Sequence, residues 1–269
     1  TYRIIRMANE RITEGIVRDV LRDYGYYLPG NGISVEEQKS EIQSVKSLLS
    51  KAGKAAKGGA GYPEFIISTQ TDTQFIIIFE CKSDVRKHVS SDRNRPVEFA
   101  VDGVLHYAKF LSEKYTVIAV AVSGITKEQL KISTFLFAAG ADEGKTLVTE
   151  SGMPVTDLLP FDDYYRLASF DPEVARKRHN DLLDFSRELH ELIWAKAKIS
   201  EEDKPLLVSG TLIALMNTTF MKTFNALPAN ELQDAWLDAI RKELNKADIP
   251  QAKKDTMLQP YTYIAVHPN

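Results

Sequence analysis

Two short apolar runs in the first third of the chain carry charged side chains that could act together. The first run spans residues 61–68 and contains Glu64, and the second spans residues 74–82 and contains Glu80 and Lys82. Both runs are rich in Ile and Phe and are separated by polar residues, which predicts a β-hairpin. The sequence therefore places two carboxylates and an ammonium group on neighbouring strands.

The turn at residues 71–73 fixes the expected register of this hairpin. With three residues in the turn, counting back along both strands places Glu64 opposite Glu80. Because side chains alternate along a strand, Glu64, Glu80 and Lys82 share one face. The other face is expected to carry Phe65, Ile67, Ile77, Phe79 and Cys81. A slip of one residue would separate the charged groups.

These side-chain types suit hydrolysis at a phosphate. Two facing carboxylates offer hard oxygen ligands for Mg²⁺, which usually takes one or two protein carboxylates together with phosphate oxygens and waters. A lysine on the same face can orient or help deprotonate the attacking water and offset the charge that develops on the phosphate. The alternative is that both glutamates and the lysine are solvated residues at a strand end.

The order Pro63-Glu64, followed by Glu80-Cys81-Lys82 on the next strand, resembles the PD-(D/E)xK motif of restriction endonucleases, with Glu64 in place of the first Asp. The resemblance implies an α/β fold, with a mixed sheet flanked by helices, and hydrolysis of double-stranded DNA. It implies Mg²⁺ as the cofactor, with Mn²⁺ as a substitute. Glu64, Glu80 and the Cys81 carbonyl would bind the metal, and Lys82 would serve the nucleophile.

Glu-x-Lys alone is a weak signal, because it recurs at residues 37–39 and 143–145. Residues 37–39 fall in a helical pattern and residues 143–145 in a glycine-containing turn, whereas residues 80–82 end an apolar strand. The structural context therefore selects Glu80 and Lys82.

The segment before the hairpin is expected to be mostly helical. Apolar residues spaced by four predict a helix over residues 8–24, with Ile12, Ile16, Val20 and Tyr24. Glu14 lies in this helix, and the resemblance makes it a third metal ligand; a solvated helix carboxylate is the alternative. Residues 34–37 match a capping box, which predicts a second helix to about Leu49 or Ala52.

Two basic segments flank the hairpin. Residues 51–61 are rich in Gly and Lys and are interpreted as either a DNA-backbone contact or a plain linker, and residues 86–95 as either phosphate contacts or a solvated loop. The candidate DNA contacts are Lys54, Lys57, Arg86, Lys87, Arg93 and Arg95. A formal net charge of -3 means that any DNA contact depends on such local patches.

The region after the hairpin completes the expected mixed sheet. An amphipathic helix over residues 96–114 should pack on it through Val97, Val101, Val104, Ala108 and Leu111. Strands are expected at residues 116–122 and 132–138, which gives the order helix, helix, strand, strand, helix, strand, strand. His106 and Tyr107 lie beside the apolar stripe, where the family often places residues near the substrate; both could equally be boundary residues. His88 has no assigned role.

Glycines and a proline near residues 139–154 mark a change of character. We therefore expect a nuclease domain at residues 1–150 and an all-α helical connector domain at residues 151–269. Asp171 and Pro172 supply an N-cap and an N1 proline for a helix to about Lys196. Further helices are expected at residues 200–224, with an all-round apolar and buried segment, and at residues 230–245.

Part of the helical region carries a second resemblance. Residues 189–192 and 199–210 resemble the helical region that precedes the N6-adenine methyltransferase in fused restriction-modification enzymes of type IIG or type I-like organisation. Neither a glycine motif for AdoMet nor an Asn-Pro-Pro-Tyr motif occurs. AdoMet, the methyltransferase and a target-recognition domain would then belong to a longer parent protein, and dimerisation on DNA is a further expected partnership.

Composition narrows the remaining choices. Cys81 is the only cysteine, which rules out an intramolecular disulfide and favours a reducing cytoplasm. The strongly apolar stretches are too short to span a bilayer, so no membrane partner is expected. Two other hypotheses stay open: a catalytically silent DNA-binding or scaffold module with a nuclease-like fold, and a stand-alone repair or antiphage nuclease.

Overall fold

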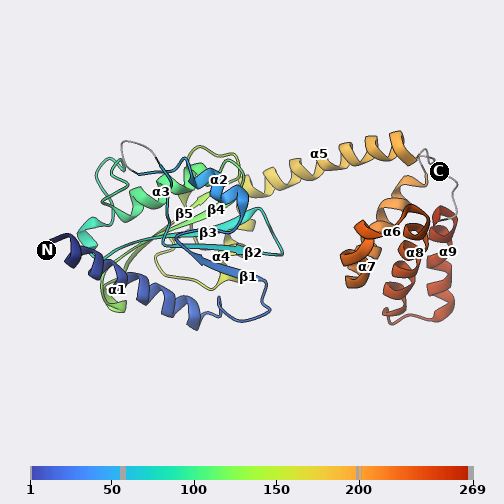
Figure 1. The fold of residues 1–269 in the computed structure, drawn as a ribbon, viewed down its shortest axis with the longest axis horizontal. Coiled ribbons are helices and arrows are strands. Elements are labelled where there is room, and N and C mark those ends of the chain that lie inside the picture. Colours follow the sequence, from blue (N-terminus) through green and yellow to red (C-terminus); the bar gives the residue numbers. More distant parts are fainter. Residues whose placement is uncertain (1, 55–58, 198–199, 201, 266–269) are drawn as a thin grey trace. The chain divides into compact units, whose positions relative to one another are not determined.

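The computed structural model describes residues 2–54, 59–197, 200 and 202–265. The chain divides into two compact units, residues 1–180 and residues 181–269. The first unit is α/β and the second is helical (Figure 1). The division lies after Asn180 rather than at residue 150, because Phe161, Tyr164 and Val174 belong to a hydrophobic core of the first unit.

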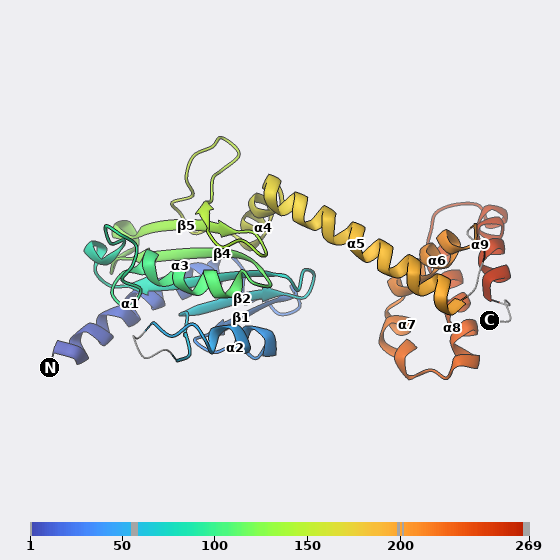
Figure 2. The ribbon, with the colours of Figure 1, turned by 90° about the horizontal axis from the view of Figure 1, so that it is seen from above.

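The first unit is built on a six-stranded sheet with the strand order β1-β2-β3-β4-β5-β6 (Figures 1 and 2). Its strands are β1 (Ile33–Glu37), β2 (Phe65–Thr69), β3 (Phe75–Lys82), β4 (Thr116–Ser123), β5 (Lys131–Phe137) and β6 (Lys145–Thr146). Strands β3 and β4 are parallel, and the other neighbouring pairs are antiparallel. The sheet is therefore mixed, as the sequence predicts.

The β2–β3 hairpin has the predicted register. Phe65 pairs with Phe79, and the Glu64 N–H donates to the Phe79 carbonyl at 3.0 Å, although the strands are joined by residues 70–74. The predicted division of faces is also confirmed. Phe65, Ile67, Ile77, Phe79 and Cys81 all lie in one core, which we call the first core.

Helices cover both faces of the sheet. Helices α1 (Tyr2–Asp23) and α4 (Phe161–Ser169) contribute to the first core. Helices α2 (Gln43–Leu49) and α3 (Ala100–Leu111) pack on the other face and form the second core with Ile66, Ile76 and Ile78 (Figure 2). Helix α3 carries the chain from β3 to the parallel strand β4, a connection that a hairpin cannot make.

The buried side of α1 differs from the predicted stripe. Ile12 and Tyr24 are 46% and 44% exposed, whereas Val17 and Leu21 are fully buried in the first core. The predicted stripe is therefore wrong at Ile12 and Tyr24, whereas Val20 is partly buried and packs against the first core. Thr13 helps to fix the orientation, because its hydroxyl donates to the Gly124 carbonyl at 2.6 Å and so holds that side of the helix against the sheet.

The predicted capping box at residues 34–37 is wrong. These residues lie in β1, which pairs with β2, and α2 begins only at Gln43. Ile33 and Val35 pack against the first core, so burial follows the period of two of a strand and overrides the local capping signal. Residues 37–39 consequently end a strand and do not lie in a helix, and Gln38 has a φ of 62°.

Helix α3 begins at Ala100 and not at residue 96. Val101, Val104, Ala108 and Leu111 are buried as predicted, but Val97 is 57% exposed. The buried carboxylate of Asp102 accepts from the Ser90 and Arg95 N–H groups and holds the preceding segment outside the helix. Strands β4 and β5 confirm the predicted strands, whereas β1 and β6 were not expected.

The helical part agrees with the prediction at its beginning. Asp171 caps α5 (Pro172–Ala197) by accepting from the Glu173 N–H at 3.0 Å. The single helix expected at residues 200–224 is instead broken at Asn217, whose side chain accepts from the Phe220 N–H. The elements of this region are α6 (Lys204–Met216), α7 (Thr218–Thr223), α8 (Ala229–Asn245) and the unexpected α9 (Gln251–Ala265).

Helix α6 is less buried than its all-round apolar sequence predicts. Leu212 and Met216 are 62% and 69% exposed, while Ala214 packs with Trp236 and Ile240 of α8. Within the ranges that the structure covers, no helix has the length and apolar character needed to cross a membrane.

Candidate active site

The three predicted catalytic residues lie together where β3 ends. Glu80 and Lys82 are 1% and 7% exposed, and the Lys82 Nζ donates to Glu80 Oε1 at 2.8 Å. Glu64 directly precedes β2, and its Oε2 accepts from the Cys81 N–H at 3.2 Å. A side chain from one strand of the hairpin therefore binds the backbone of the other at the level of Glu80.

The two carboxylates have opposite electrostatic environments. Burial raises the pKa of Glu64 well above its usual value, and the neighbouring Glu80 carboxylate raises this pKa further. Burial also acts to raise the pKa of Glu80, but the ammonium groups of Lys54 and Lys82 outweigh burial and hold that pKa below its usual value. Glu80 is thus the charged member of the pair, and Glu64 ionises with difficulty unless another positive charge arrives.

Lys54 is the site residue that sequence reasoning assigned to another role. Its Nζ lies 2.5 Å from Glu80 Oε1 and 4.2 Å from the centre of the Tyr107 ring, and its side chain is only 13% exposed. The lysine that was expected to contact the DNA backbone therefore lies beside Glu80. The lysine-rich composition of residues 51–61 could flag the segment but could not show which lysine turns inward.

Two glycines allow this close packing. A Cβ at Gly103 of α3 would lie 2.7 Å from the Lys54 Nζ and 3.0 Å from the Glu80 carboxyl carbon. A Cβ at Gly61 would lie 2.5 Å from the Tyr107 ring. Real Cβ contacts are not this short, so both positions exclude any larger residue unless the site shifts.

The donor set fits a hard divalent cation. Glu80 Oε2 is buried and has no hydrogen-bond partner among the described residues, which leaves an acceptor beside Glu64 for a further positive group. Among the residues that the structure describes, no group of three or more His, Cys, Asp or Glu side chains is arranged to hold a metal ion. Two carboxylates are sufficient for Mg²⁺, because it retains waters and takes phosphate oxygens.

Cys81 and Glu14 were the other predicted ligands. The Cys81 side chain is fully buried in the first core, and burial first, then Glu64, Glu80 and Glu14, raise the pKa of its thiol. Glu14 lies next to Thr13, whose hydroxyl also contacts the Lys82 carbonyl at 3.4 Å. Helix α1 therefore reaches the end of β3, while the Cys81 carbonyl and Glu14 as ligands stay predictions.

The remaining predicted DNA contacts are scattered. Arg86 is bound to Asp84 at 3.0 Å, and Lys87 is bound to Glu98 at 2.8 Å. Lys57 lies outside the described residues. Neighbouring carboxylates therefore partner two of these cations, Arg86 and Lys87.

Arg93 and Arg95 lie on the segment before α3. Arg93 has a φ of 51°, and its guanidinium group lies 5.6 Å from the centre of the Phe135 ring. Arg95 is exposed, and its N–H is bound to Asp102. Arg93 borders a pocket.

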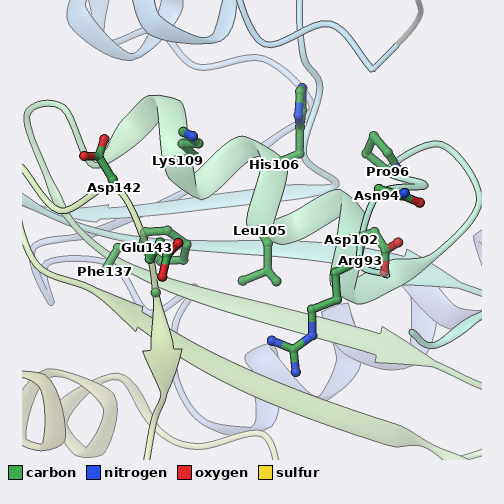
Figure 3. Close-up of a pocket in the computed structure, with 11 residues that line it drawn as sticks. Arg93, Asn94, Pro96, Asp102, Leu105, His106, Lys109, Phe137, Asp142 and Glu143 are labelled. Atoms are coloured by element: carbon green, nitrogen blue, oxygen red, sulfur yellow. The ribbon is translucent and has the colours of Figure 1, made fainter. Parts of the chain in front are cut away.

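That pocket has a volume of about 550 Å³ and opens beside α3 (Figure 3). It is lined by Arg93, Asn94, Pro96, Asp102, Leu105, His106, Lys109, Phe137, Asp142, Glu143 and Gly144. Burial lowers the pKa of His106, and its buried Nε2 has no hydrogen-bond partner in the described ranges. His106 borders the pocket, whereas Tyr107 accepts from the Tyr62 N–H and its ring contacts Lys54.

His88, which had no predicted role, is a buried residue near the end of β4 and the start of β5. Its Nδ1 lies 2.8 Å from the Ser123 hydroxyl and its Nε2 lies 2.9 Å from the Ser133 hydroxyl. Burial lowers the pKa of this imidazole to about 4. Burial therefore favours the neutral form of His88. Two hydroxyl groups provide hydrogen-bond partners for both ring nitrogens of that form.

Comparison of this chain with family models, curated proteins and solved structures finds no match. Any function of this chain is therefore inferred from the residues of the site and their geometry.

Proposed function

We propose that the first unit is a magnesium-dependent endonuclease that hydrolyses phosphodiester bonds in double-stranded DNA. The observation that supports this most strongly is the placement of Glu64, whose carboxylate accepts from the Cys81 N–H at 3.2 Å, beside the buried Glu80, which Lys82 contacts at 2.8 Å. Neighbouring carboxylates with little hydration are unfavourable without a counter-charge, so this arrangement favours a site for cations.

Each residue has a defined role in this proposal. Glu64 and Glu80 hold the ion, with the Cys81 carbonyl and Glu14 as proposed further ligands and Mn²⁺ as a substitute for Mg²⁺. When bound, the ion offsets phosphate charge and lowers the pKa of a coordinated water. Lys82 orients the attacking water and stabilises the negative charge that develops on the phosphate.

The bonds that change follow from this arrangement. The water oxygen forms a bond to phosphorus while the bond from phosphorus to the 3′ oxygen breaks. The water gives up a proton and the departing 3′ oxygen takes one up, so the products are a 5′ phosphate and a 3′ hydroxyl.

A second candidate is a catalytically silent DNA-binding or scaffold module. One observation favours it: Glu80 Oε1 already contacts the ammonium groups of both Lys54 and Lys82, which balances its charge without a metal ion. A silent module and a nuclease therefore differ in whether the site takes up a divalent cation.

The wider context is also a proposal. The helical region would connect a cytoplasmic nuclease to a methyltransferase that uses AdoMet and to a target-recognition domain of a longer parent protein, with dimerisation on DNA allowing both strands to be cut. A stand-alone repair or antiphage nuclease is the alternative. Cleavage by this chain alone, with no partner domain present, would favour that alternative.

Titration calorimetry with Mg²⁺ and Mn²⁺ tests the proposed function without knowledge of the DNA sequence. We expect binding to the wild type, loss of binding in Glu80→Ala, and wild-type binding in Glu37→Ala, which removes the same side chain from the end of β1. Equal binding in all three proteins would place the ion elsewhere. Absence of binding in all three would support the silent module.

A further inference from the structure

Lys54 is the residue of the site that the PD-(D/E)xK pattern does not account for. It lies outside the hairpin, between α2 and β2, yet its Nζ is 2.5 Å from Glu80 Oε1. The same oxygen accepts from Lys82 at 2.8 Å, while Glu80 Oε2 has no hydrogen-bond partner among the described residues. One oxygen therefore serves two ammonium groups, and the other serves none.

This arrangement is crowded with positive charge. Two Nζ atoms that contact the same oxygen at 2.5 and 2.8 Å are at most 5.3 Å apart, the sum of the two distances, so they repel each other. A divalent cation on the two carboxylates would bring four positive charges against two negative ones. The site can relieve this excess if one ammonium group leaves or if an anion enters.

The two lysines differ in how firmly the fold holds them. Lys82 is the last residue of β3 and pairs with Ser123 of β4, so its backbone is fixed within the sheet. Lys54 belongs to a connection between elements and follows Gly53, and its ammonium group is held by Glu80 and the Tyr107 ring. Lys54 is therefore the cation that can move at the lower cost.

We propose that Lys54 is an exchangeable counter-ion of Glu80, which a divalent cation displaces and which then binds a non-bridging oxygen of the substrate phosphodiester. This inference rests on the proposed function and adds a substrate-binding residue to it. A phosphodiester has two non-bridging oxygens, and an ammonium group beside the ion can take the one that the ion leaves. The Tyr107 ring keeps the ammonium group close to the site in either position.

Metal affinity of Lys54→Met provides the decisive test, because it has a readout that does not depend on cleavage. Removal of the competing charge should make Mg²⁺ or Mn²⁺ bind about tenfold more tightly in calorimetry. Lys54→Arg, which keeps the charge, should bind like the wild type. Lys46→Met is the matched control. It removes an equal charge from α2, where Lys46 forms an exposed ion pair with Glu41.

The outcomes separate this inference from the proposed function. Loss of metal binding in Glu80→Ala with unchanged or weaker binding in Lys54→Met would overturn the exchange and leave the nuclease proposal standing. Absence of metal binding in the wild type would overturn both. Tighter binding in Lys46→Met as well would show a general effect of net charge and would also overturn the exchange.

The phosphate contact is tested by DNA binding. Fluorescence anisotropy with a duplex of mixed sequence in Mg²⁺ should show that Lys54→Met lowers the salt-dependence slope by about one, the value for one lost phosphate contact. Lys46→Met should keep the wild-type slope. A wild-type slope in Lys54→Met, or no DNA binding by the metal-loaded wild type, would overturn the phosphate contact.

Discussion

Two Glu-x-Lys tripeptides, residues 37–39 and 80–82, end strands of the same sheet, and their surroundings differ sharply. Glu37 is bound to Arg18 at 2.7 Å, with 45% of its side chain exposed. Glu80 is 1% exposed and is enclosed by cations and by a helix. The same residue pattern therefore gives a surface ion pair in one place and a buried charged cluster in the other.

The position of the strand in the sheet accounts for this difference. β1 is an edge strand, whereas β3 lies between β2 and β4 and is covered by α3. An edge carboxylate keeps most of its hydration, and its pair contributes little to stability. A central one loses its hydration and depends on the charges placed around it.

Glu80→Ala should give the largest loss of stability. It leaves Lys54 and Lys82 without their shared carboxylate in a buried environment, which costs about 3–5 kcal/mol. Urea unfolding at pH 7 measures this loss, and Glu37→Ala, expected to cost less than about 1 kcal/mol, is the control. Similar losses in the two variants would remove the distinction between edge and centre.

Acid should destabilise the chain through His88. This residue contacts Ser123, which pairs with Lys82 at the end of β3. The pKa of His88 is lowered to about 4 in the fold, so the unfolded chain binds a proton first as the pH falls below about 6.5. The contribution of neutral His88 is therefore present at neutral pH and is lost between about pH 6.5 and 4, by about 1–3 kcal/mol.

Urea midpoints at pH 7 and pH 5 measure this effect in the wild type and in His88→Gln. Glu80 adds little between pH 7 and pH 5, because its pKa is lowered from the ordinary value of 4.5 and its stabilising charge is lost only at lower pH. The difference between the two proteins isolates the histidine. An identical pH dependence in both would show that His88 does not titrate in this range.

Gly103→Ala should lower the folding stability by a smaller amount than the changes above. The new Cβ would meet Lys54, the Pro96 carbonyl and Glu80, which outweighs the gain in helix propensity and costs about 1–2 kcal/mol. Gly15→Ala in α1 is the matched control, because no atom lies within 4 Å of its Cβ and helix propensity alone should stabilise it. Thermal unfolding of both variants tests whether Gly103→Ala lowers the unfolding temperature while Gly15→Ala raises it.

The smallest effect on stability should come from the ion pair between Arg18 and Glu37 at the edge strand β1. A double-mutant cycle with Arg18→Met and Glu37→Ala should give a coupling below about 1 kcal/mol that weakens as salt is added. The Arg18 guanidinium also lies 5.5 Å from the centre of the Phe65 ring, so the single Arg18 change should exceed the coupling. A coupling as large as the loss in Glu80→Ala would contradict the comparison.

The hairpin could be predicted because its information is local. The short turn between two adjacent apolar runs specifies the pairing of Phe65 with Phe79. The period of two along each strand then specifies the common face of Glu64, Glu80 and Lys82. The same reasoning placed the apolar side of α3, whose periodicity is strong.

Features set by distant contacts could not be predicted in this way. Ile33 and Val35 form a strand only because β2 offers an edge, so a capping pattern misled the prediction there. The inward turn of Lys54 depends on Glu80, Gly103 and Tyr107, which are distant in sequence. A lysine beside glycines carries no local signal that separates a surface role from a buried one.

The hydrogen bond from the Cys81 N–H to Glu64 also guards the alignment of the hairpin. A slip of two residues would keep every side chain on its own face and exchange Ile and Phe for one another. The packing of the two cores would therefore disfavour this slip only weakly. It would, however, move Glu64 about 7 Å along β3 and away from Glu80. The charged cluster thus works as a check on assembly, since only the correctly aligned chain can satisfy it.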